Sequence, residues 1–137
     1  MMNSRMEAAA EITNKIRSAR KYYFAELKPS QLEDGLAVVY AITNCDTEEV
    51  LYVGRTKNLR RRLYTNHLMG PASNARLKKY LVEDDREPTI VTMEDAKRYL
   101  KDHCYFQYIA VEDLHERGKI EGLLSYMLDV RYIDEEH

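Results

Sequence analysis

Apolar residues near the start of the chain follow a helical spacing. Between Met6 and Leu27 they recur at steps of three and four residues, which is the period of an amphipathic helix. The members of this stripe are Ala9, Ile12, Ile16, Ala19, Tyr23 and Leu27. Proline disfavours α geometry in the residue before it, so we predict that this helix ends at Lys28-Pro29. The helix could pack on the domain or mediate dimerisation.

Two stretches of β-branched and apolar residues follow, at 36–43 and 50–53, with the polar segment 44–49 between them. This pattern predicts a β-hairpin, and a similar stretch at 104–111 predicts a third strand.

The hairpin carries two tyrosines whose placement decides whether they can act together. If Asp46 lies at the tip of the turn, Tyr40 and Tyr52 are equidistant from it. Residues that pair across an antiparallel hairpin point to the same side of the sheet. We therefore expect the two tyrosines to face each other on one side of the sheet.

Helical spacing returns after the hairpin in four segments. They start at the capping residue Asn58, at Ala75, at Met93 and at the capping residue Asp113, and the last runs to about Leu128. In the first two segments, leucines at steps of four face the sheet, and the basic side chains of the second face outward. The inward leucines are Leu59, Leu63, Leu77 and Leu81, and the outward basic residues are Arg76, Lys78 and Lys79.

In this order, the elements predict an α/β domain with a small three-stranded, mainly antiparallel sheet flanked by helices, and an extra N-terminal amphipathic helix. We assign residues 1–30 to an N-terminal helical extension and residues 31–137 to the domain. A length of 137 residues, with 45% hydrophobic and 32% charged composition, suits one such domain.

Charge and composition narrow the functional classes. Lys and Arg number 21 against 23 Asp and Glu, and the net charge of -2 gives no global reason to bind nucleic acid, so any basic surface must be local. Charged residues interrupt the first twenty positions, which predicts a cytosolic protein without a signal peptide or membrane span. Cys45 and Cys104 have no CxxC spacing, and we assign them no role.

Two tyrosine motifs carry the strongest functional signal. The triplet Val38-Val39-Tyr40 is followed by a longer and more specific motif, which ends in an arginine ten positions after its tyrosine. The second motif reads Tyr52-Val53-Gly54-Arg55-Thr56-Lys57-Asn58-Leu59, with Arg62 after it. Together with a later helix that holds Glu121, the pattern resembles the GIY-YIG nuclease family over roughly residues 36 to 128.

The resemblance implies an endonuclease that hydrolyses phosphodiester bonds with one Mg²⁺ or Mn²⁺ ion. It implies that Tyr40 activates water, as a phenolate or through a shared water, and that Tyr52 helps to place the phosphate. It further implies that Arg62 clamps the phosphate and that Glu121 binds the metal. The alternatives for the last two residues are a solvated arginine run, 60–62, and a glutamate that solvates one edge of its helix.

The residues expected to contact DNA lie in the second motif and on the basic helices. Asn58 also suits a helix cap, and Gly54 an ordinary strand end. DNA is the expected partner, which implies a nucleoid-associated protein when it is bound, and RNA is the alternative. The residues expected at the DNA are Gly54, Arg55, Lys57, Asn58, Arg61, Arg76 and Lys79.

The chain departs from the family pattern at three places. Val38 replaces the first glycine of the first triplet. Asn66 stands where many relatives carry a histidine or tyrosine, so we expect His67 either in the catalytic set, after a one-residue slip, or in an exposed loop. The asparagine that often follows the glutamate helix has no equivalent, and Asp134 begins an acidic end that either solubilises the chain or, near the cleft, repels DNA.

Three functions compete on this evidence. The first is a metal-dependent DNA endonuclease or nickase. The second is a catalytically weak or inactive module of the same fold that binds nucleic acid, which Asn66 and the near-neutral charge favour. The third is an interaction protein whose N-terminal helix forms a homodimer or docks a targeting partner, because the remaining chain resembles neither a zinc finger nor a helix-turn-helix.

Overall fold

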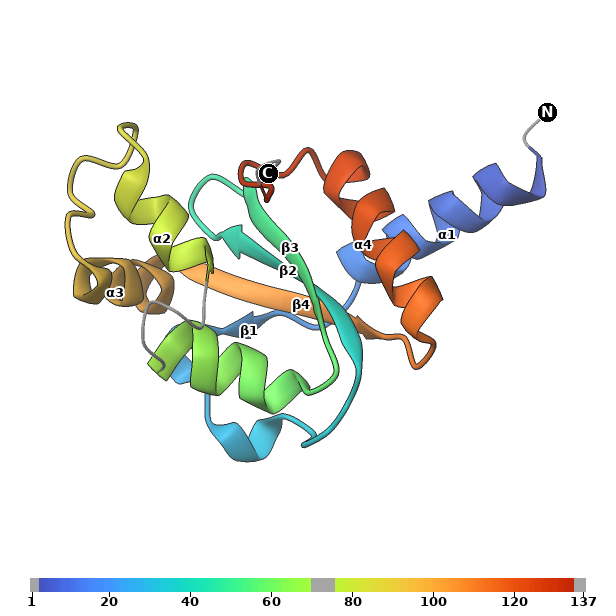
Figure 1. Ribbon diagram of the computed structural model, residues 1–137, viewed down its shortest axis with the longest axis horizontal. Coiled ribbons are helices and arrows are strands. Elements are labelled where there is room, and N and C mark those ends of the chain that lie inside the picture. Colours follow the sequence, from blue (N-terminus) through green and yellow to red (C-terminus); the bar gives the residue numbers. More distant parts are fainter. Residues whose placement is uncertain (1–2, 70–75, 135–137) are drawn as a thin grey trace.

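The computed structural model describes residues 3–69 and 76–134, with only the backbone described at 66–69. Its centre is a four-stranded antiparallel sheet in the order β1-β4-β2-β3, with helices over both faces (Figure 1). The predicted class is confirmed, although the sheet has four strands and not three. In chain order the elements are α1 (Ser4–Arg17), β1 (Tyr22–Tyr23), η1 (Phe24–Glu26), η2 (Pro29–Gln31), β2 (Val38–Asn44), β3 (Val50–Thr56), η3 (Arg61–Met69), α2 (Arg76–Glu83), α3 (Met93–His103), β4 (Cys104–Ala110) and α4 (Leu114–Met127).

The fourth strand comes from a segment that the sequence pattern assigns to the first helix. α1 ends at Arg17 and not at Lys28, and Tyr22 pairs with Phe106 of β4. The Tyr22 ring stacks on Phe106 at 5.2 Å and on Tyr108 at 5.7 Å between ring centroids. Such aromatic pairs stabilise a sheet. The predicted helix end is therefore wrong because packing between strands outweighs the local helical spacing.

The hairpin of β2 and β3 has a register that differs from the expected one. Tyr40 pairs with Gly54 and Tyr52 pairs with Ile42, so the two tyrosines are diagonal neighbours and not directly opposite. Part of this shift arises where the register changes between Ile42 and Thr43, which leaves one extra residue in β3. Because the total shift is two residues, both tyrosines still lie on one face, with ring centroids 6.4 Å apart.

Each face of the sheet buries its own apolar cluster. The face that carries the two tyrosines packs under η3, α2 and α3, and the opposite face packs against α1 and α4 (Figure 1). The predicted inward leucines are confirmed. The first cluster includes Tyr40, Ile42, Tyr52, Leu59, Leu63, Leu77, Leu81 and Phe106, and the second includes Ile16, Val39, Ala41, Val53, Ile109, Ile120 and Leu124.

α2 presents less positive charge than its sequence predicts. Only 2% of the Lys78 surface is exposed, so its predicted outward placement is wrong. α2 packs on α3 here, and burial together with the neighbouring Lys97 lowers the pKa of Lys78. Arg76 and Lys79 remain on the exposed face of this helix.

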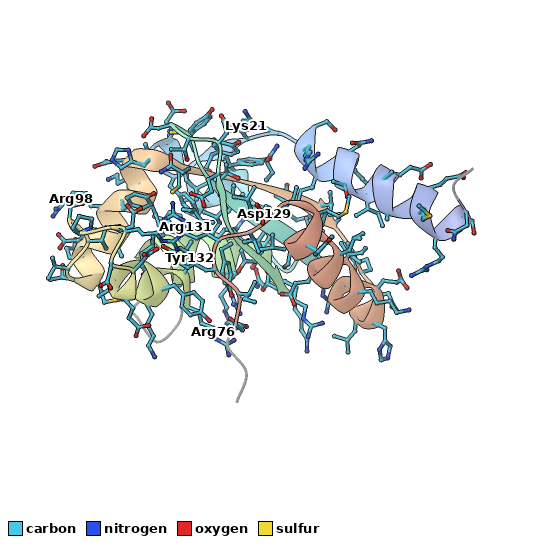
Figure 2. All side chains as sticks on the ribbon, turned by 90° about the horizontal axis from the view of Figure 1, so that it is seen from above. Lys21, Arg76, Arg98, Asp129, Arg131 and Tyr132 are labelled. Atoms are coloured by element: carbon cyan, nitrogen blue, oxygen red, sulfur yellow. The ribbon has the colours of Figure 1, made fainter. Side chains whose placement is uncertain are left out.

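The segment after α4 wraps around the outer edge of β3. The amides of Arg131 and Tyr132 donate hydrogen bonds of 3.0 Å to the carbonyls of Val50 and Leu51. Figure 2 shows Arg131 and Tyr132 together near the middle of the molecule. The segment therefore ties the end of α4 to the hairpin. The Arg131 guanidinium forms ion pairs with three carboxylates, those of Glu49, Asp84 and Glu87.

Candidate active site

Tyr40 lies at the centre of the candidate site and is fully buried. It belongs to β2, the strand between β4 and β3, and its side chain interacts with Arg62 of η3. Burial raises the pKa of Tyr40, Tyr52 raises it further, and Arg62 only partly opposes this effect. The phenol is therefore neutral at ordinary pH. Of the two predicted routes to water activation, this environment favours the shared water over a resting phenolate.

Gly54 makes room for the Tyr40 ring. A Cβ atom at this position would overlap the Tyr40 hydroxyl and its ring carbons. The close approach of ring and backbone explains the glycine of the second motif, because Gly54 sits opposite Tyr40 in the register.

We predict that Gly54→Ala lowers the free energy of unfolding by about 1–3 kcal/mol, the usual range for overpacking a core. The Tyr40 ring is fully buried in a packed apolar cluster, so moving it aside disturbs its neighbours. Urea denaturation measures the effect. The control is Gly122→Ala, whose new Cβ would meet nothing within 4 Å and which should keep or raise the stability because alanine favours a helix. Equal stability of the two variants would show that the ring does not need this glycine.

Arg62 holds an unsatisfied hydrogen-bond donor inside the site. Its Nε is the one buried side-chain polar atom without a partner among the residues that the structure describes. A buried donor without a partner costs free energy in the folded state. An anionic oxygen at this point would remove that cost, which is the property expected of a phosphate clamp.

Tyr52 lies between Tyr40 and Asp134. Burial raises the pKa of Tyr52 to about 12, with Asp134 adding to the rise and Arg76 opposing it. Asp134 accepts a hydrogen bond of 2.8 Å from the Tyr80 hydroxyl and pairs with Arg76. Asp134, for which the sequence left open a DNA-repelling role near the cleft, thus lies beside the site and is paired with Arg76. No local pattern in the sequence indicates this contact, since the partners are 58 and 54 positions apart.

Glu121 reaches the site around the edge of the sheet. Its helix, α4, packs through Ile120 and Leu124 on the face opposite Tyr40. β3 is the edge strand, and there the Arg55 Nε lies 3.8 Å from the Glu121 Oε1. The charge of this carboxylate contributes to the raised pKa of both site tyrosines. Glu121 is therefore within electrostatic reach of them, although its helix covers the other face.

A cationic cleft adjoins these residues at the end of β3. Its volume is about 370 Å³, and within the described chain each charged residue lining it is basic. Arg117 is almost buried, with only 4% of its surface exposed. It donates hydrogen bonds to the Val111 and Glu112 carbonyls at 3.1 and 2.9 Å. Sequence reasoning missed Arg117, because nothing in the periodicity of α4 points to it. The lining residues are Arg55, Thr56, Lys57, Asn58, Arg61, Arg62, Leu114 and Arg117.

The remaining predicted DNA contacts fall into different environments. The Asn58 side chain accepts a hydrogen bond from the Arg61 amide at 3.2 Å, which confirms the helix cap, and it donates to Asp34 at 3.0 Å. Lys57 and Arg61 are exposed at the cleft. Lys79 is exposed on α2 and is not among the residues that line the cleft, and Arg76 is held by Asp134. The side chains of Asn66 and His67 lie outside the described part of the chain.

The chemistry of the site suits a hard divalent cation held by few protein ligands. The described residues contain no group of three or more His, Cys, Asp or Glu side chains that could hold a metal ion alone. Glu121 offers one carboxylate, to which water and phosphate oxygens would be added, and this is how Mg²⁺ is commonly bound. Cys104 is buried and Cys45 partly buried, and both are free thiols.

The family assignment follows from a comparison with known protein families. A model of the GIY-YIG catalytic domain matches residues 36–109, more than half of the 137 residues, so the chain belongs to the GIY-YIG family. The matched segment includes Tyr40, Tyr52 and Arg62 and ends before Glu121. Comparison with curated proteins and with solved structures gave no match.

Membership sets the general class of chemistry. A GIY-YIG domain is a nuclease-family domain, its substrate class is nucleic acid, and nucleases of this family generally depend on a metal ion. Within residues 3–69 and 76–134, no helix has the length and apolar character needed to cross a membrane.

Proposed function

We propose that this protein is a metal-dependent DNA endonuclease or nickase whose reaction centre consists of Tyr40, Tyr52, Arg62 and Glu121. The observation that carries the proposal is their convergence from three directions. Two tyrosines share one face of the hairpin, Arg62 approaches from η3, and Glu121 comes around the edge of β3. The four groups interact electrostatically, as a common reaction centre requires.

The reacting phosphate would lie against Arg62, in the wall of the cationic cleft. The unpartnered Nε of Arg62 would donate to a non-bridging oxygen of the reacting phosphate. Lys57 and Arg61 at the cleft would hold adjacent phosphates of the same strand. A local cleft of this kind accounts for DNA binding by a chain whose net charge is -2.

The attacking water would be oriented by Tyr40 as a neutral phenol. Its hydroxyl, under the charge of Arg62, would accept the proton of the attacking water while passing its own proton to a second water, so that the phenol stays neutral. Tyr52, with a pKa raised to about 12, acts in the same neutral form and helps to place the phosphate. A divalent ion, when bound at Glu121, supplies Lewis-acid stabilisation of the charge that develops on the phosphate. We propose Mg²⁺ or Mn²⁺, one ion per site.

Plasmid cleavage tests this function. Supercoiled plasmid is incubated with the protein in Mg²⁺, in Mn²⁺ and in EDTA, beside the Glu121→Gln variant. We expect relaxed or linear product with either metal, none in EDTA, and a loss of product with Glu121→Gln. Salt-sensitive binding of the plasmid without cleavage in either metal would instead identify a non-catalytic binding module.

A further inference from the structure

The Arg55 guanidinium lies against the carboxylate that is proposed to bind the metal. Its Nε lies 3.8 Å from the Glu121 Oε1, and the two side chains are 46% and 33% exposed. The positive charge of Arg55 opposes the rise that burial causes in the pKa of Glu121. In the protein without a metal ion, Glu121 therefore already has a counter-ion.

A glycine in α4 gives the Arg55 guanidinium room beside the helix. A Cβ atom at Gly118 would overlap the Arg55 Nη1. The absence of a side chain there lets the guanidinium lie against the helix and reach Glu121 in the next turn. Glycine is unfavourable inside a helix, so a packing role accounts for its presence. Gly122, the other glycine of α4, would place a Cβ in open space.

Arg55 also belongs to a second environment, the cationic cleft. It lines that cleft together with Lys57, Arg61, Arg62 and Arg117, and no acidic residue is among the described residues that form its wall. A phosphate in the cleft would therefore attract the Arg55 guanidinium away from Glu121. The side chain has the exposure and length to exchange between the two sites.

We propose that Arg55 gates the metal site: it occupies the cation position at Glu121 in the free protein and moves to a substrate phosphate in the cleft when DNA binds. This inference rests on the proposed function for the identity of the metal ligand. Transfer of the guanidinium leaves the carboxylate open to the metal ion, so DNA and metal bind cooperatively. Such coupling is reciprocal, because each ligand raises the affinity for the other by the same factor. Metal capture is thereby restricted to the substrate-bound state.

Mn²⁺ binding in the absence of nucleic acid tests the gate without any cleavage reaction. Isothermal titration with Mn²⁺ is carried out on wild type, Arg55→Ala and Gly118→Ala, with Gly122→Ala as the matched control. Gly118→Ala displaces the guanidinium but keeps its charge, and both glycine variants raise helix propensity equally. We expect Arg55→Ala and Gly118→Ala to bind Mn²⁺ at least about 5-fold more tightly than wild type, and Gly122→Ala to match wild type.

DNA affinity in EDTA gives the second readout. With a short labelled duplex, Arg55→Ala is expected to bind more weakly and to lose about one unit of salt slope. Gly118→Ala is expected to bind more tightly than wild type, since its guanidinium is already released. The Gly122→Ala control is again expected to match wild type.

The outcomes separate this inference from the proposed function. If Glu121→Gln leaves Mn²⁺ binding unchanged, the proposed metal ligand is wrong and the gate falls with it. If Glu121→Gln abolishes Mn²⁺ binding but Arg55→Ala and Gly118→Ala bind like wild type, only the gate is overturned. Tighter binding in Arg55→Ala alone also overturns it, because net charge and not the contact would then be responsible.

Discussion

Replacing Arg62 with alanine is expected to lower the rate of DNA cleavage by about 10²–10³-fold, the usual cost of removing one transition-state hydrogen-bond donor. Two contacts would be lost together. Arg62 interacts with Tyr40, and its buried Nε, which has no partner among the described residues, is the proposed donor to the phosphate. Single-turnover cleavage at saturating DNA measures the chemical step, and fluorescence anisotropy measures binding separately. Arg62→Lys should recover little of the rate, because an ammonium lacks the planar fork.

The control for this prediction is another arginine outside the site. Arg98 lies on α3, 64% of its side chain is exposed, and its ion-pair partner is Asp95 (Figure 2). Arg98→Ala removes the same charge and should cleave at the wild-type rate. Near-identical rates for Arg62→Ala and Arg98→Ala would mean that Arg62 is only part of a solvated arginine run.

Replacing Arg131 with methionine is expected to lower the free energy of unfolding by about 3–5 kcal/mol, the cost of removing one partner from buried charges. The Arg131 side chain is only 13% exposed and holds together the loop after β2, the loop after α2 and the C-terminal segment. Methionine keeps the aliphatic volume but leaves Glu49, Asp84 and Glu87 without their common cation. Urea denaturation at neutral pH measures the loss, and Arg98→Met is the exposed control.

Acid should reduce this difference. Arg131 lowers the pKa of Glu49, and this shift is lost in Arg131→Met, whereas Arg86 and Tyr132 lower the pKa of Asp84 in both proteins. A carboxylate whose pKa is lower in the folded state stabilises the fold above its unfolded pKa and loses that contribution as pH falls. Unfolded Asp and Glu titrate at about 3.9 and 4.3. We therefore expect the gap between wild type and Arg131→Met to be widest above about pH 5 and to narrow below about pH 4. A gap that widens on acidification would contradict the role of the Glu49 carboxylate.

The sequence predicts elements well where one local signal dominates. Asp113 caps α4 and Asn58 caps the helical segment after β3, as their positions before apolar-periodic segments indicate. The hairpin follows from two β-branched runs around a polar turn. The tyrosines share a face because a register error of two residues leaves the side-chain direction unchanged.

Features set by tertiary contacts lie beyond the reach of local patterns. Tyr22 fits a helical stripe by spacing, yet its ring is stacked on β4, which lies some eighty residues away in the sequence. The position of Lys78 in the sequence predicts a solvent-exposed side chain, but the packing of α2 on α3 buries it. The same reason hides the ion pair of Arg55 with Glu121, because it depends on how α4 crosses the edge of β3.

The central claim is that Glu121 and the two tyrosines act on one phosphate. They do so although α4, which carries Glu121, covers the sheet face opposite the two tyrosines. The most direct measurement is anomalous diffraction from Mn²⁺ in crystals of the Arg62→Ala variant bound to uncleaved DNA. The account predicts one Mn²⁺ peak at the Glu121 carboxylate, with a DNA phosphate between the ion and the Tyr40 hydroxyl. A Mn²⁺ ion bound elsewhere, or a phosphate backbone that passes outside the site formed by Tyr40, Tyr52 and Glu121, would contradict it.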